Sequence, residues 1–223
     1  MSNSSLVSYT KISPNRTAGR TQKIDTITIH CVVGQCSVET LGSIFATTAR
    51  KASSNYGIGP DGRIGMYVEE KDRSWCTSSS ANDNRAITIE VASDTTHPYK
   101  VNDKAYKALI ELLADICKRN GIKKLLWEGK KSLIGKVDKQ NMTVHRWFAN
   151  KSCPGDYLYN LHGQIAKEVN TKLAPIVKTK HEMAVESACN LEDKTGLSKA
   201  TIKWLWSYKH ADDLFIKLWN AMK

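Results

Sequence analysis

Two short apolar segments in the first half of the chain predict β-strands. Residues 24–31 read IDTITIHC, in which isoleucine and threonine alternate before a histidine and a cysteine. Residues 87–91 read ITIEV, and their three β-branched apolar side chains share one face because successive strand residues point to opposite sides. Thr88 and Glu90 occupy the other face, so Glu90 is expected to point away from its apolar neighbours.

A helix and a hairpin are predicted between these two strands. Residues 39–51 have a helical pattern, and residues 56–68 read as a hairpin whose turn is the Pro-Asp-Gly sequence at residues 60–62. A strand and a hairpin therefore follow a helix, so the elements do not alternate in a simple way.

The clearest helical pattern covers residues 103–119. Its apolar residues recur at spacings of three and four, with Asn102 or Asp103 as the N-cap and Gly121 just past the end. The sequence therefore predicts a well-delimited amphipathic helix here.

Two further elements complete this part of the chain. A short extended run at residues 142–144 precedes His145, and a last helix is predicted over residues 157–173. Together the elements predict an α/β fold with a mixed central β-sheet flanked by helices. His30, Glu90 and His145 then lie near strand ends.

The helical pattern breaks at Pro175, which divides the chain into two predicted parts. Residues 1–174 form the α/β domain, residues 175–182 a linker, and residues 183–223 a small all-α C-terminal module. A module of ~40 residues is close to the lower limit for independent folding, so it is expected to pack tightly or to dimerise.

Within the module, residues 184–191 and 199–208 are predicted to be short helices, and the apolar residues of 214–222 recur at a helical period. The module is also rich in aromatic residues: Trp204, Trp206, Tyr208 and Trp219. Such residues can stack on wall sugars, form the module's core or mediate dimerisation, and the pattern leaves these three alternatives open.

Composition excludes several classes of protein. Of 223 residues, 41% are hydrophobic and 25% charged, which excludes global disorder. No apolar run approaches the ~18 residues of a membrane helix, and the first 16 residues lack the apolar core of a secretory signal. We therefore expect synthesis in the cytoplasm and no membrane insertion.

The chain is strongly basic, with a net charge of +11. Residues 176–223 hold eight Lys and six Asp or Glu, so +9 of this charge lies in residues 1–175. This balance suits nucleic acid, an anionic membrane surface or a polyanionic bacterial wall, and charge alone does not choose between them.

The six cysteines form no CxxC pair, so any metal site must gather ligands from distant segments.

The sequence HRWFANKSCPG, residues 145–155, carries the most informative chemistry. Zinc is bound by imidazole and thiolate groups, and His145 followed eight residues later by Cys153 can supply two ligands. His30 is the best placed third ligand, and three protein ligands leave an open position, which is typical of catalytic zinc. Alternatively, His30 is a hydrogen-bonded strand-end residue and Cys153 a small buried side chain.

Four segments follow one another in the order ITIHC, SSNYGIGPDGRIG, AITIEVASD and TVHRWFANKSCPG, over about residues 24–173. They resemble the type 2 N-acetylmuramoyl-L-alanine amidases, zinc enzymes that include phage lysins and share a fold with peptidoglycan-recognition proteins. This resemblance implies an amidase fold and a zinc site for this chain.

The resemblance implies a role for five residues. His30, His145 and Cys153 match the zinc ligands. Glu90 matches an acidic residue that some of these amidases use in catalysis, and Lys151 matches a lysine that some use to polarise the carbonyl. Without the resemblance, Glu90 would be read as an exposed strand residue and Lys151 as a solvated loop residue.

The chain departs from the family pattern at one position. Several relatives have a tyrosine where this chain has Ser54, and Tyr56, two residues on, would face the same way in a strand. Whether either assists catalysis stays open.

Trp75 and Trp147 either stack on sugars near the cleft or pack in the core, and Cys31 is expected to be a core residue.

The resemblance implies zinc-dependent hydrolysis of the amide between N-acetylmuramic acid and L-alanine in bacterial peptidoglycan, by an endolysin or autolysin. The expected partners are peptidoglycan and its anionic wall polymers, not nucleic acid, and the enzyme would act on the wall after release. A non-catalytic peptidoglycan-recognition module is the alternative, although such modules usually lack a ligand equivalent to Cys153. Nucleic-acid binding would explain the charge but not the ligand set.

Overall fold

The computed structural model describes residues 2–175 and 178–222. The chain divides between residues 174 and 175 into two compact units. Residues 176 and 177 of the predicted linker lie outside the described residues. Helix α5 (Lys180–Thr195) begins inside the predicted linker, which therefore extends too far at its C-terminal end.

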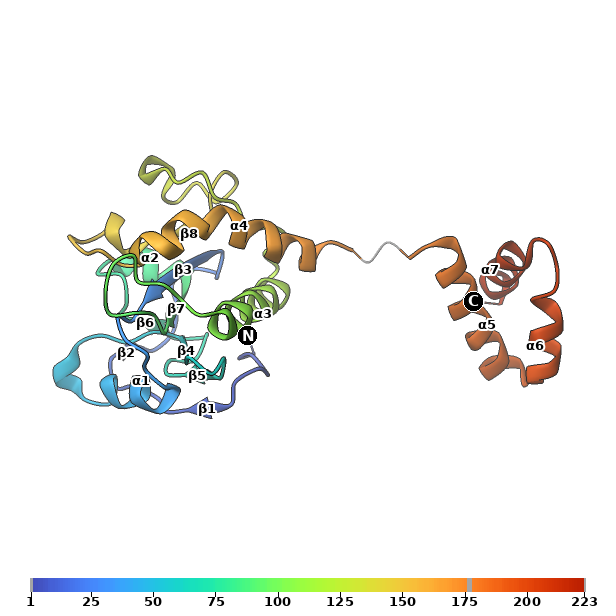
Figure 1. The fold of residues 1–223 in the computed structure, drawn as a ribbon, viewed down its shortest axis with the longest axis horizontal. Helices are drawn as coiled ribbons and strands as arrows, with labels where there is room; N and C mark the ends of the chain where they lie inside the picture. Colours follow the sequence, from blue (N-terminus) through green and yellow to red (C-terminus); the bar gives the residue numbers. More distant parts are fainter. Residues whose placement is uncertain (1, 176–177, 223) are drawn as a thin grey trace. The chain divides into compact units, whose positions relative to one another are not determined.

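The first unit is built on a sheet of six strands in the described residues (Figure 1). Their spatial order is β1 (Tyr9–Thr10), β5 (Ile64–Met66), β4 (Tyr56–Ile58), β7 (Ala86–Val91), β3 (Thr26–Cys31) and β8 (Met142–Thr143). Strands β2 (Arg16–Thr17) and β6 (Arg73–Ser74) pair separately as an antiparallel ribbon. The predicted mixed sheet is confirmed.

Parallel pairing brings three strand ends to one edge of this sheet. Strand β3 lies between β7 and β8 and is parallel to both, and β4 is parallel to β7. The hairpin of β4 and β5 is antiparallel, as predicted. In open sheets with parallel strands, ligands bind outside the carboxyl ends of the strands. Here His30 and Glu90 lie at the carboxyl ends of β3 and β7, and β8 ends beside them.

Helices cover both faces of the sheet. Helix α3 (Asp103–Asn120) and helix α4 (Gly155–Leu173) share one apolar core with the side chains of β3 and β7 that point to their face. Helix α1 (Val38–Ile44) lies against the other face of the β4–β5 hairpin. The Leu41 side chain of α1 lies so close to the β4 backbone that a Cβ on Gly57 would be 2.8 Å from it.

Most predicted elements of this unit are confirmed. Helix α3 begins after Asn102, whose side chain accepts a hydrogen bond from the Ala105 amide, and ends at Gly121, which has φ 69°. The predicted helix over residues 39–51 is wrong in extent, because α1 ends at Ile44 and a 3-10 turn follows at Thr48–Arg50. Consecutive threonines with stiff β-branched side chains disfavour the helix after this point.

The second unit contains three helices in the described residues: α5, α6 (Lys199–Leu205) and α7 (Ala211–Ala221). Helix α5 starts earlier than predicted because Thr179 and Glu182 form a capping box. Helix α6 ends three residues before the predicted end. The buried core of the unit combines Ala188, Leu191 and Phe215 with neighbouring apolar residues.

None of the helices in the described part of the chain combines the length and the apolar character that crossing a membrane requires.

Candidate active site

Adjacent parallel strands place His30 and Glu90 side by side. The two residues are direct partners in the register of β3 and β7, so their side chains project from the same face of the sheet. His30 is 1% exposed, and its Nδ1 lies 4.0 Å from Glu90 Oε1. Glu90 is therefore not a freely solvated strand residue, because its carboxylate faces a buried imidazole.

The third strand end and the following loop bring two more predicted residues to this point. His145 opens a 3-10 turn (His145–Trp147) directly after β8, and its ring centroid lies 5.1 Å from that of His30. Cys153, in the loop before α4, places Sγ 3.2 Å from His30 Nδ1. One candidate ligand atom each from His30, His145 and Cys153 lies within 4.8 Å of the others.

A charged clamp holds the loop between His145 and Cys153. The Arg146 guanidinium donates to both Asp156 Oδ1, at 3.0 Å, and the Ser152 carbonyl, at 2.6 Å. The Arg146 amide donates to the Cys153 carbonyl at 3.1 Å. The clamp ties the turn that carries the cysteine to the first turn of α4.

The turn after Cys153 requires glycine. Gly155 has φ 78°, a conformation that side chains disfavour, and a Cβ there would lie 2.9 Å from the Tyr99 side chain and 3.1 Å from the Pro98 carbonyl. The Pro-Gly sequence therefore lets the chain pass close to the 97–99 loop.

Burial keeps the two histidines neutral. It lowers the pKa of His30 to about 3, with a smaller contribution from His145, and it lowers the pKa of His145, with a contribution from Lys151. Burial raises the pKa of Glu90 to about 8. Both imidazoles are thus in the form that binds a metal at neutral pH.

The Cys153 thiol has a different environment. A hydrogen bond with the Cys31 thiol, together with burial, raises the pKa of Cys153. A divalent cation beside the sulfur would oppose this effect, because it stabilises the thiolate. Cys31 belongs to the apolar core, as predicted, and also contacts the candidate ligand.

The donor set fits zinc. Two imidazoles and one thiolate are the borderline-soft ligands that zinc prefers, and three protein ligands leave a fourth position open. His30 Nε2 and Glu90 Oε2 are buried without a hydrogen-bond partner among the described residues. His30, Cys76 and Glu90 form a second possible ligand group. It shares His30 with the first group but has the Glu90 carboxylate in place of an imidazole.

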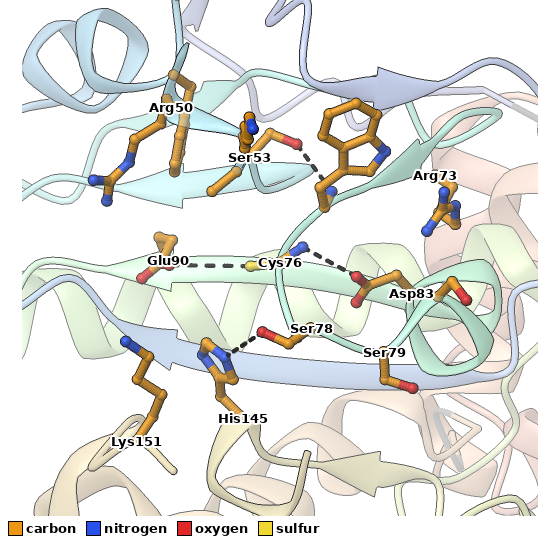
Figure 2. Close-up of a pocket in the computed structure, with 15 residues that line it drawn as sticks. Arg50, Ser53, Arg73, Cys76, Ser78, Ser79, Asp83, Glu90, His145 and Lys151 are labelled. Carbon is orange, nitrogen blue, oxygen red and sulfur yellow. Dashed lines mark hydrogen bonds between the residues drawn. The ribbon is translucent and has the colours of Figure 1, made fainter. Parts of the chain in front are cut away.

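A pocket of about 600 Å³ opens beside these residues (Figure 2). Glu90, His145 and Lys151 line it, together with Arg50 and Trp75. In the view of Figure 2 Glu90 lies between Arg50 and Lys151, and the charge of Arg50 lowers the pKa of Glu90 against the larger effect of burial. The pocket is large enough for a small ligand and lies at the edge of the sheet where such sites occur.

Sequence reasoning missed most of the pocket lining, including two residues that contact the predicted ones. The Cys76 thiol lies 4.0 Å from Glu90 Oε1, and Ser78 Oγ lies 3.4 Å from His145 Nε2. Ser78 has φ 64°, the left-handed conformation that side chains rarely adopt and that is often found at functional sites. Both lie in the irregular stretch after Trp75, where no periodic pattern marks them.

Ser54 and Tyr56 are buried outside the pocket lining. The Ser54 hydroxyl donates to the Tyr56 carbonyl at 2.7 Å, and the Tyr56 hydroxyl donates to Glu70 Oε1 at 2.7 Å. Trp147 is also buried, with its ring stacked on Trp127 at 5.2 Å. Of the two tryptophans considered for the cleft, Trp75 alone lines the pocket.

Comparison with known proteins agrees with this fold. The solved structure of PlyL has a TM-score of 0.53 with 14% identity, and covers 72% of this chain and 95% of its own. A mutant endolysin from Bacillus subtilis has a TM-score of 0.52 with 15% identity, over 72% and 97%. Drosophila peptidoglycan recognition protein SD has a TM-score of 0.50 with 20% identity, over 69% and 88%.

The fold is thus that of amidases and peptidoglycan-recognition proteins. The sequence model of the N-acetylmuramoyl-L-alanine amidase family matches residues 20–156, and the chain belongs to this family because the match spans more than half of it. No curated protein sequence matches the chain.

Proposed function

We propose that the protein is a zinc-dependent N-acetylmuramoyl-L-alanine amidase that hydrolyses the amide between N-acetylmuramic acid and L-alanine in peptidoglycan. The observation that supports this most strongly is the convergence of His30, His145 and Cys153 within 4.8 Å, beside the Glu90 carboxylate. Membership of the amidase family supplies the class of substrate.

In this proposal His30, His145 and Cys153 hold the zinc ion. When bound, zinc polarises an amide carbonyl and lowers the pKa of a water molecule toward neutrality. His30 is buried near the end of β3, and the hydrogen bonds of Arg146 hold the loop that carries Cys153. These residues orient the reacting groups before substrate arrives.

Glu90 is proposed to move the proton. Its carboxyl group lines the pocket next to His30. A zinc ion held by the three ligands would favour the charged form of this group, which could then take a proton from the attacking water and deliver it to the leaving amine of L-alanine. Replacing Glu90 by Gln keeps the shape but removes the base, so a loss of ~10²-fold or more in turnover is expected.

Lys151 is proposed to stabilise the oxyanion. It lines the same pocket and is close enough to His145 to lower the pKa of that residue. An ammonium group there would face the negative charge that develops on the carbonyl oxygen. Lys151→Met is expected to lower turnover ~10²-fold while leaving zinc content unchanged.

The proposal is tested by digesting purified peptidoglycan and assaying new amino-terminal alanine and new reducing sugar ends separately. We expect alanine ends without reducing ends from the wild type, and none from Cys153→Ala. Cys189→Ala is the matched control, because Cys189 is exposed and lies in the second unit. New reducing ends would indicate a glycosidase and contradict the mechanism.

A non-catalytic peptidoglycan-recognition module is the second candidate, favoured by the fold shared with drosophila peptidoglycan recognition protein SD. It predicts binding of peptidoglycan without release of alanine ends by the zinc-loaded wild type.

We further propose that the amidase acts on the cell wall as an endolysin or autolysin, drawn to anionic wall polymers by the net charge of +11. Raising the ionic strength should weaken this attraction.

A further inference from the structure

One residue of the pocket has a backbone conformation that packing does not explain. Ser78 has φ 64°, and the residue is exposed. A side chain in this left-handed region strains the backbone, and glycine would adopt the same turn with less strain. A strained residue beside a candidate active site therefore points to a function of its side chain.

The residues on both sides of Ser78 are anchored. The buried Asp83 carboxylate accepts hydrogen bonds from the Thr77 hydroxyl at 2.6 Å and from the Thr77 amide at 3.2 Å. Ser79 is the N-cap of helix α2 (Ser80–Arg85), and its hydroxyl accepts from an amide of the first turn at 3.3 Å. These contacts fix the backbone before and after Ser78, so its hydroxyl has a defined position.

The Ser78 hydroxyl faces His145 (Figure 2). Ser78 Oγ lies 3.4 Å from His145 Nε2. That is a long hydrogen bond, of the kind that shortens in active sites when bound groups fix the geometry. A neutral imidazole carries its proton on one nitrogen, and the lone pair of the other nitrogen binds a metal. If the hydroxyl accepts from Nε2–H, Nδ1 is the nitrogen left for the metal.

This contact has the form expected beside a metal-binding histidine. Such a residue commonly donates its second ring nitrogen to an oxygen acceptor, which fixes the tautomer and the orientation of the ring. Within residues 2–175 and 178–222, Ser78 Oγ is the hydrogen-bond partner of the His145 ring. The serine hydroxyl thus supplies an acceptor that glycine, the less strained residue for this turn, would lack.

We propose that Ser78 is a positioning residue of the zinc site, whose hydroxyl accepts from His145 Nε2–H and so keeps Nδ1 unprotonated for the ion. The inference rests on the proposed function, because it concerns the zinc ion of that same site. It assigns to the strained turn a role that the five predicted site residues do not fill.

Ser78→Gly separates this role from a purely structural one. The substitution removes the hydroxyl and relaxes the backbone. Stability of the metal-free full chain is expected to change little, because relief of strain offsets the greater freedom of glycine in the unfolded chain. Zinc affinity, measured by competition with a chromogenic chelator, is expected to fall about tenfold.

Lys51→Gly is the matched control for this affinity. Lys51 is also exposed and left-handed, with φ 49°, and it lines the same pocket. Its side chain makes no hydrogen bond or ion pair with any residue that the structure describes. Lys51→Gly is therefore expected to bind zinc like the wild type, although its backbone relaxes in the same way.

Ser78→Asn tests rescue by a different acceptor. Asparagine visits the left-handed conformation more readily than most residues with a side chain, and its carbonyl oxygen can accept from Nε2–H. This variant is expected to retain most of the zinc affinity. Ser78→Ala keeps the strain without an acceptor and is expected to lose affinity as Ser78→Gly does.

The tautomer of His145 is measured directly in the metal-free full chain at neutral pH. The nitrogen chemical shifts of the ring, in a long-range proton–nitrogen NMR spectrum, distinguish the protonated nitrogen, and His145→Gln identifies the signals. We expect the Nε2–H form to predominate in the wild type and a measurable fraction of the Nδ1–H form in Ser78→Gly.

Three results would overturn the inference. The first is equal zinc affinity in the wild type and Ser78→Gly. The second is an Nδ1–H tautomer in the wild type, because the Ser78 hydroxyl would then donate to Nε2. The third is an equal loss of affinity in Ser78→Gly and Lys51→Gly, which would assign the effect to the backbone.

These measurements are independent of amide hydrolysis. If the wild type releases no alanine ends from peptidoglycan, the proposed function fails, whereas the tautomer and the zinc affinities still decide the role of Ser78. If the wild type cuts the amide and Ser78→Gly retains its zinc affinity and tautomer, only the inference about Ser78 fails.

Discussion

Cys153 Sγ lies 3.2 Å from His30 Nδ1, although the two residues are 123 positions apart in the chain. One side chain ends a buried central strand, and the other sits in the loop before α4. No local sequence pattern around either residue predicts this contact, because it joins two segments that only the fold brings together. The closeness of these two donors is the geometric basis of the proposed zinc site.

Removal of metal is expected to abolish amide hydrolysis, and added zinc to restore it. Cys153→Ala should leave two imidazole ligands and lower the zinc content per chain, measured by elemental analysis after dialysis. Cys189→Ala is the control and should retain the parent's zinc. Equal zinc in both variants would contradict the assignment of Cys153 as a ligand.

Arg146 is expected to act on the metal site without touching the metal. Arg146→Ala removes the hydrogen bonds to Asp156 and Ser152 that hold the cysteine loop, and zinc affinity should fall ~10- to 100-fold. A competition assay with a chromogenic chelator measures this change.

Arg63→Ala is the matched control for the clamp. Arg63 also makes a two-pronged contact with a carboxylate, that of Glu39, but on an exposed hairpin. Its zinc affinity should equal that of the wild type. If Arg63→Ala and Arg146→Ala reduced affinity alike, the loss would reflect general destabilisation and not the clamp.

Glu70 is expected to be a major determinant of stability in the first unit. Its side chain is 1% exposed and accepts from Tyr56 at 2.7 Å, Arg119 at 2.6 Å and Asn120 at 2.9 Å. Glu70→Gln removes the buried negative charge that accepts from Arg119 and Asn120, while Arg119 keeps its contact with Asp115, so the free energy of unfolding should fall by about 2 kcal/mol.

Urea unfolding of the first unit measures this effect. Glu39→Gln, which breaks the exposed contact with Arg63, is the control and should change stability little. A small effect of Glu70→Gln would show that the buried network rearranges around the amide.

His162 is expected to make stability fall in mild acid. Burial lowers its pKa to about 4, while an unfolded histidine titrates near 6.5. Above pH 6.5 both states are neutral. As the pH falls from 6.5 toward 4, only the unfolded state takes up this proton, so stability is lost by up to about 3 kcal/mol.

The difference between wild type and His162→Gln isolates this residue from other histidines. Unfolding by urea at pH 7 and pH 5 should show a smaller loss of stability for His162→Gln than for the wild type. The same loss in both would show that His162 is not the titrating group.

Local pattern in the sequence was enough to predict many elements and the candidate ligands. The alternation around His30 and Glu90 predicted β3 and β7, and Asn102 and Gly121 marked the ends of α3. His145 and Cys153 were identified by residue type and by resemblance to amidases. These features are readable because side-chain period, caps and ligand chemistry are properties of neighbouring residues.

Where local signals were weak or misread, the predicted boundaries were wrong. The helix predicted over residues 39–51 ends at Ile44 in the structure. The predicted linker continues to residue 182, although the capping box at Thr179 already starts α5. The pocket residues Cys76 and Ser78 carry no pattern at all, because irregular segments are placed by what packs around them.

Only the tertiary structure decided which residues meet. The register of β3 against β7 sets Glu90 beside His30, and the Arg146 clamp brings Cys153 to the same point. Equally, helix packing in the second unit buries part of Trp206 and leaves Trp204 exposed, although both share the same local composition. Sequence period specifies a face of an element, whereas the partner of that face depends on contacts between distant segments.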